Sequence, residues 1–182
     1  LVPLMERFAL DEDGAHYTRL LGAERAFEFA AGELPFFFWQ YGDPAECALI
    51  PAVGATDAVL FSFFAKHGHV LEFTDEDDTD FIAYYHQSAT ELGWASSDES
   101  SISELLRYPL QDRPRSYLPA SIPAAPYAPE VMDDFLRWAA NEASRVILLY
   151  GKDDPWTAGA IDLGASAAAR DSFRFFVSGQ NH

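Results

Sequence analysis

Two residues near the C-terminal end of the chain have the types and settings of a catalytic acid and base. Asp154 follows the apolar run RVILLYG in the segment GKDDPW (151–156), and His182 follows SFRFFVSG in the segment GQNH (179–182). In a Ser-His-Asp triad the imidazole takes the proton of the nucleophile, and a carboxylate fixes the imidazole tautomer. In one class of hydrolases built on a mostly parallel sheet, these groups follow strand ends in the chain order Ser, acid, His. The pair therefore predicts two members of a hydrolase triad.

The pattern leaves alternatives open. Asp153 stands beside Asp154, which we favour because it occupies the fourth position of a G-x-x-D turn followed by Pro155. In a purely structural interpretation, Asp154 caps the helix that begins at Pro155 and His182 is a polar chain end.

The elements that must position this pair are one amphipathic helix and two strands. Residues 131–143 (VMDDFLRWAANEA) have the apolar spacing of a helix, with Val131, Phe135, Trp138 and Ala139 on one face. The run RVILLYG is typical of a strand buried on both faces in a parallel sheet, and SFRFFVSG predicts a second strand. Helix, strand, loop, short helix and strand fit a βαβ arrangement, so the fold class is α/β.

Before these elements the chain is predicted to be helical. Amphipathic segments cover residues 1–32, with a break near Asp13-Gly14, then 56–67 with Thr56 or Asp57 as the cap, and then 75–94, where the acidic group 75–80 favours a helix start. Residues 95–129, rich in serine and then in proline, predict an extended connector with a short helix at 102–106.

Composition excludes several classes of partner. The 182 residues carry a formal charge of −17, which repels nucleic acid phosphates and anionic membranes, and no apolar run approaches the roughly 20 residues of a membrane span. Cys47 is the only cysteine, so no intrachain disulfide is expected. His67 and His69 lack further ligands at suitable spacing, and the cluster 75–78 lacks the glycine of a calcium loop, so we expect neither a metal nor a cofactor.

Whole segments resemble the prolyl tri/tetrapeptidyl aminopeptidase family of secreted bacterial serine peptidases. The similarity is carried by FFFWQYG (36–42) with Cys47, AYYHQSATELGW (83–94), VMDDFLRW (131–138), LYGKDDPWTAG (149–159) and the final GQNH. It implies a mostly helical cap and connector at 1–122, followed at 123–182 by the C-terminal part of an α/β-hydrolase sheet. It also assigns the acid to Asp154 and the base to His182.

The resemblance further implies a secreted exopeptidase that releases N-terminal tri- or tetrapeptides after proline through an acyl-enzyme. No G-x-S-x-G elbow is present, and Gly164-Ala165-Ser166 is expected in a helix, so we nominate no serine as the nucleophile. The opening Leu1 and the ending at His182 suggest a fragment, which we expect to be inactive alone.

Candidate substrate-binding residues come from chemistry combined with this resemblance. A peptide's α-ammonium group calls for an acidic partner, for which Glu28 and Glu33 are the candidates and Asp43 is a further one. Proline calls for a rigid apolar slot, for which we choose Trp39 and Trp156 from an aromatic set that also includes Phe36, Phe37, Phe38 and Tyr41. Such a set also serves as ordinary core packing.

Two other functions fit the same residues. One is a different cap-bearing hydrolase, such as an esterase or a proline iminopeptidase, that uses the same Asp-His pair. The other is a non-catalytic binding module that lacks a nucleophile. The sequence leaves the oligomeric state open.

Overall fold

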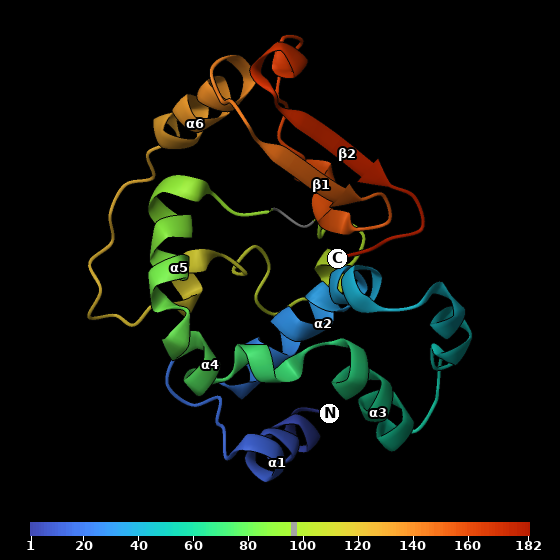
Figure 1. Cartoon of the computed structure of the whole chain (residues 1–182). Coiled ribbons are helices and arrows are strands. Elements are labelled where there is room, and N and C mark those ends of the chain that lie inside the picture. The colour runs from blue at the N-terminus through green and yellow to red at the C-terminus, as the bar shows by residue number, and fades with distance from the viewer. Residues whose placement is uncertain (96–97) are drawn as a thin grey trace.

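A computed structural model describes residues 1–95 and 98–182 and combines a helix-rich part before residue 123, called the cap below, with a small parallel sheet (Figure 1). Two serines of the predicted connector, at 96 and 97, lie outside the described residues. The helices are α1 (Val2–Asp13), α2 (Ala23–Tyr41), α3 (Asp57–His67), α4 (Asp75–Asp80), α5 (Ile82–Gln87) and α6 (Glu130–Asn141), and the strands are β1 (Ile147–Gly151) and β2 (Phe173–Val177). This mixed, helix-rich architecture is consistent with the predicted α/β class.

The helix starts and stops of the cap follow local sequence signals. The first helix ends at Gly14, whose φ of 63° suits glycine, and the Thr56 hydroxyl caps α3 by accepting the amide of Val59 at 3.4 Å. The predicted break near Gly14 and the predicted start of α3 are confirmed.

Two boundaries differ from the prediction. The second helix continues beyond Gly32 to Tyr41 although Pro35 inside it has no N–H to donate. The aromatic side chains after Pro35 offset that loss, because Phe38 packs on Phe63 of α3 and Phe36 packs edge-on against Trp156. The segment predicted as one helix at 75–94 is divided at Phe81 into α4 and α5, and α5 runs into a π-helical turn at Ser88–Leu92.

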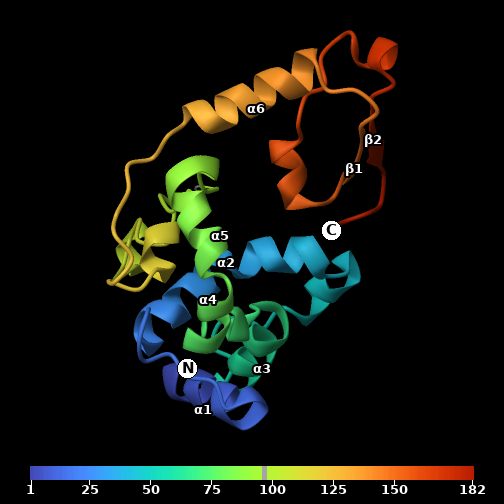
Figure 2. The same cartoon turned by 60° about the vertical axis from the view of Figure 1, so that its left-hand side comes forward.

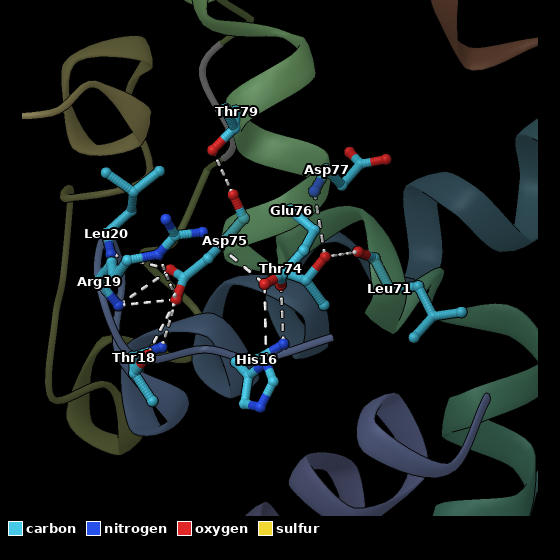
Figure 3. Close-up of polar contacts among 10 residues, drawn as sticks. All are labelled: His16, Thr18, Arg19, Leu20, Leu71, Thr74, Asp75, Glu76, Asp77 and Thr79. Atoms are coloured by element: carbon cyan, nitrogen blue, oxygen red, sulfur yellow. Dashed lines mark hydrogen bonds and ion pairs between the residues drawn. The ribbon is translucent and has the colours of Figure 1, made fainter. Parts of the chain in front are cut away.

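The acidic start of α4 ties it to the loop before α2 (Figure 3). The carboxylate of Asp75, only 1% exposed, accepts the backbone amides of Thr18 and Arg19 at 2.8 Å and that of Leu20 at 2.9 Å. Thr74, not the acidic group, supplies the side-chain cap of α4 through the amide of Asp77. Asp75 therefore has a structural role, and no group of side chains suited to a metal ion occurs among residues 1–95 and 98–182.

The two strands pair in parallel, with Ile147 opposite Phe173 and Gly151 opposite Val177, as predicted. The burial on both faces that the run RVILLYG indicates is not reached within the described chain: Ile147 is 71% exposed and every residue of β2 is exposed. The reason is that no further layer of the described chain covers these faces. The apolar side chains of α6 at Val131, Phe135 and Trp138 are exposed as well.

The crossover between β1 and β2 contains two short 3-10 helices, Pro155–Gly159 and Ala167–Arg170. The segment 164–166, which we expected to be helical, is a turn in which Gly164 has a φ of 72° and a Cβ would collide with the Ala140 carbonyl. The guanidinium of Arg170 donates to the carbonyls of Ala140 and Ala143, both at 2.9 Å, at the end of α6. It thereby satisfies carbonyls that the helix leaves free and fixes the crossover against α6.

The end of the chain meets the end of α2, as both views show (Figure 2). The backbone amide of His182 donates to the carbonyl of Gln40 at 3.1 Å, and the side-chain amide of Asn181 donates to the carbonyl of Gly42 at 2.9 Å. The cap and the sheet therefore join at the loop that carries His182. None of the described helices has the length and apolarity to cross a membrane.

Candidate active site

Asp154 and His182 are brought together by the loops that follow the two strands. The amide of Lys152 donates to the carbonyl of Val177 at 2.9 Å, and the amide of Asp153 donates to the carbonyl of Gln180 at 3.0 Å. Because the strands are parallel and adjacent, both loops leave the same edge of the sheet.

The side chains of Asp154 and His182 are joined by a hydrogen bond. Nδ1 of His182 lies 2.9 Å from Oδ2 of Asp154. The other carboxylate oxygen of Asp154 accepts the backbone amide of Trp156 at 2.9 Å, so the carboxylate is fixed from two sides. The side chain of Asp154 is 9% exposed and that of His182 is 52% exposed. This arrangement leaves Nε2 of the imidazole as the nitrogen that can exchange a proton with a third group, as a general base requires.

Of the two neighbouring aspartates, Asp154 is the one that contacts His182. Asp153 is exposed and joins the His182 loop through its backbone amide. The capping alternative is also realised, because Asp154 precedes the 3-10 helix Pro155–Gly159 and caps it through Trp156. The carboxylate of Asp154 thus both contacts His182 and caps the 3-10 helix Pro155–Gly159.

A cavity of about 420 Å³ lies next to this pair. Three acidic side chains, Glu33, Glu72 and Asp77, line it together with aromatic rings that include Phe36, Phe37, Tyr84, Trp94 and Trp156. Tyr41 also lines the cavity, and its ring stands at 86° to the imidazole of His182 with the centroids 5.7 Å apart. Tyr41 therefore links the cavity to the Asp-His pair.

Two acidic groups of the cavity, Glu33 and Asp77, are held where a negative charge is costly. Burial raises the pKa of Glu33, and the neighbouring Asp112 and Glu72 raise it further. Burial, followed by the charges of Glu72 and Asp80, raises the pKa of Asp77 to about 6. A bound cation would relieve this repulsion, so the cavity is chemically suited to an ammonium group.

The cavity includes two of the four predicted substrate-binding residues, Glu33 and Trp156. The carboxylate of Glu28 instead accepts the backbone amides of Arg107 at 2.8 Å and Tyr108 at 2.7 Å. Trp39 is exposed outside the cavity and packs edge-on against Phe38. The further candidate Asp43 caps the 3-10 helix Pro44–Leu49.

Sequence reasoning missed Glu72, Asp77 and Gln40 as residues of this cavity. Asp77 was attributed to helix capping as part of its acidic cluster. The only sequence signal for Glu72 is its i+3 spacing from His69, whose Nδ1 lies 2.6 Å from a carboxylate oxygen of Glu72. His69 thus has a carboxylate partner in Glu72 and stacks on the rings of Phe37 and Tyr41.

Comparison with known proteins identifies the family of the chain. Residues 2–182 match the family described as PS-10 peptidase S37, and the chain belongs to that family. The family resemblance inferred from the sequence is confirmed.

A curated relative gives the comparison more detail. The chain is 34% identical, over its whole length, to the prolyl tri/tetrapeptidyl aminopeptidase of Streptomyces mobaraensis. It spans 38% of the length of that protein. No solved structure matches the chain.

Proposed function

We propose that this chain supplies the acid and the base of a serine peptidase, with Asp154 as the acid and His182 as the base. The observation that carries the proposal is the 2.9 Å hydrogen bond between Nδ1 of His182 and Asp154 at the ends of two adjacent parallel strands. Membership of the peptidase S37 family supports the same chemistry. An α/β-hydrolase sheet, of which β1 and β2 would be the last strands, is part of the proposal.

The proposed reaction runs through an acyl-enzyme. A serine contributed by another part of the longer protein attacks the scissile carbonyl, and Nε2 of His182 takes the hydroxyl proton. The imidazolium, stabilised by ionised Asp154, passes that proton to the leaving amine as the peptide bond breaks. Water then attacks the ester while His182 accepts a proton from it, and His182 returns that proton to the serine oxygen as the released peptide leaves as a carboxylic acid. Because the chain contains no candidate for this serine, we expect no activity from residues 1–182 alone.

The proposed substrate is a peptide with a free N-terminus, cleaved after proline. The acidic cavity supports the first part, because Glu33, Glu72 and Asp77 offer carboxylates to an α-ammonium group beside the Asp-His pair. The edge-on pair of Phe36 and Trp156, with centroids 5.0 Å apart, offers a rigid apolar wall for a proline ring. The name of the relative, a prolyl tri/tetrapeptidyl aminopeptidase, supports both parts. Glu28 and Trp39 are not part of this proposal, because they lie outside the cavity.

Secretion is also proposed, from the family resemblance alone. The complete coding sequence tests it, since a charged and then apolar leader would precede the mature protein.

The experiment that tests the function uses the full-length protein and chromogenic tetrapeptides. Four substrates combine a free or acetylated N-terminus with proline or alanine at the cleavage point. We expect the free peptide with proline to have the highest kcat/KM. Equal turnover of free and acetylated peptides would exclude an aminopeptidase but retain a hydrolase. Failure of a serine-directed phosphonate to inactivate an active preparation would exclude the serine mechanism.

A further inference from the structure

Tyr41, the last residue of α2, is the cap side chain that packs against the imidazole of His182. The two rings are nearly perpendicular, at 86°, and their centroids are 5.7 Å apart. This edge-to-face arrangement is one that aromatic rings prefer, and it fixes the orientation of each ring relative to the other.

Several contacts keep the Tyr41 ring in this position. Its hydroxyl accepts a hydrogen bond from Nε2 of Gln40 at 2.8 Å. Its face stacks on the imidazole of His69 at 4.9 Å and 25°, and His69 is itself held by Phe37 and Glu72. Tyr41 is 50% exposed, so these neighbours, rather than deep burial, determine its position.

The backbone around Tyr41 also holds the loop of His182. The carbonyl of Gln40 accepts the amide of His182, and the carbonyl of Gly42 accepts the side-chain amide of Asn181. Three consecutive cap residues, 40–42, thus contact Asn181 and His182. These hydrogen bonds fix the position of the His182 backbone. They do not fix the torsion angles of its half-exposed side chain.

We propose that Tyr41 is a positioning residue for His182: its ring keeps the imidazole turned so that Nδ1 stays on Asp154 and Nε2 faces the nucleophile. This inference rests on the proposed function, in which His182 is the base. Tyr41 acts through His182 and takes no part in proton transfer. A cap residue thereby contributes to the rate of the chemical step as well as to the shape of the substrate cavity.

The test compares Tyr41→Ala and Tyr41→Phe in the full-length protein. Tyr127→Ala is the matched control, because Tyr127 is 49% exposed and lies outside the cavity. We expect Tyr41→Ala to lower kcat about tenfold, because losing an edge-to-face pair changes the equilibrium between orientations of the His182 ring by roughly tenfold. Tyr41→Phe retains the ring and should keep kcat within about twofold, and Tyr127→Ala should match the parent protein.

A second measurement separates this proposal from the proposed function. With ¹⁵N-labelled histidine, the proton shared by His182 and Asp154 should give a strongly downfield NMR signal in the parent protein and in Tyr41→Phe. We expect Tyr41→Ala to broaden or lose it while keeping the dispersed spectrum of a folded protein. An unchanged kcat and signal in Tyr41→Ala, or an equal loss of kcat in Tyr41→Phe, would overturn the role of Tyr41. A parent protein without peptidase activity would overturn the proposed function. In that case the NMR signal of the proton shared by His182 and Asp154 would still show whether Tyr41 positions the imidazole.

Discussion

Recognition of a free N-terminus by the acidic cavity should depend on pH through Asp77. Burial and the charges of Glu72 and Asp80 raise the pKa of this carboxyl to about 6. A group with that pKa is ionised to about 9% at pH 5 and about 91% at pH 7. An ammonium group is attracted only by the ionised form of Asp77. The affinity of the cavity for a peptide with a free N-terminus should therefore rise about tenfold between pH 5 and pH 7.

The assay isolates this effect from the titration of the catalytic groups. The ratio of kcat/KM for a free peptide to that for its acetylated counterpart cancels any group that acts equally on both. We expect the ratio to rise about tenfold from pH 5 to pH 7 in the full-length protein. Glu33, whose pKa is also raised, extends the rise to higher pH until the α-amino group of the substrate loses its proton near pH 8.

A variant and a matched control decide whether Asp77 is responsible. Asp77→Asn keeps the size of the side chain but removes the titration, so the rise should fall below about threefold. Glu76→Gln changes the adjacent, exposed carboxylate, which accepts the amide of His16 away from the cavity, and should keep the full rise. A ratio that stays constant with pH in the parent protein would refute the assignment of the cavity to an ammonium group.

Three further predictions concern the Asp-His pair and the buried acid next to Asp77. Asp154→Asn should lower kcat by about 10⁴ because it favours the wrong imidazole tautomer, and a loss no larger than that of Asp153→Asn would move the acid elsewhere. Gly151→Ala places a Cβ 2.5 Å from the Asn181 carbonyl, so the loop that carries His182 must move, and kcat should fall about 100-fold. Gly159→Ala is the control: a Cβ there meets open space, so kcat in the same assay should not change. Asp78 is fully buried, and burial raises its pKa to about 8, so the folded state holds this proton more tightly than the unfolded state does. The free energy of unfolding, measured with urea, should therefore fall by up to about 1.4 kcal/mol per pH unit between pH 4 and 8. Asp78→Asn should remove this dependence on pH.

The part of the site that the sequence predicts is the part that depends on local order. Asp154 and His182 each follow a recognisable strand, and parallel pairing brings two strand ends to one edge whatever the rest of the fold does. The start of α3 at Thr56 is equally local, because its capping hydroxyl bonds an amide three residues later.

The part that the sequence does not predict depends on contacts between distant segments. Glu28 and Glu33 are equivalent by composition, and only the fold turns one toward the backbone of Arg107 and the other into the cavity. The continuation of α2 past Pro35 depends on packing by Phe63 and Trp156, which no local rule includes. The exposure of β1 does not follow from its apolar run, because such a run shows what a strand is able to bury and not which layers the described chain provides.

The distribution of buried side chains has a consequence for the order of assembly. The main core cluster, from Met5 to Leu118 with partly buried neighbours up to Ile122, lies entirely in the cap, whereas the strands contribute nothing to it. The cap therefore has the features of a cooperative unit that forms by itself, and native-state hydrogen exchange should be slowest there. His182 can meet Gln40 and Tyr41 only after that unit exists. The geometry of the base would then be completed as a late step of folding, on a cap surface that is already rigid.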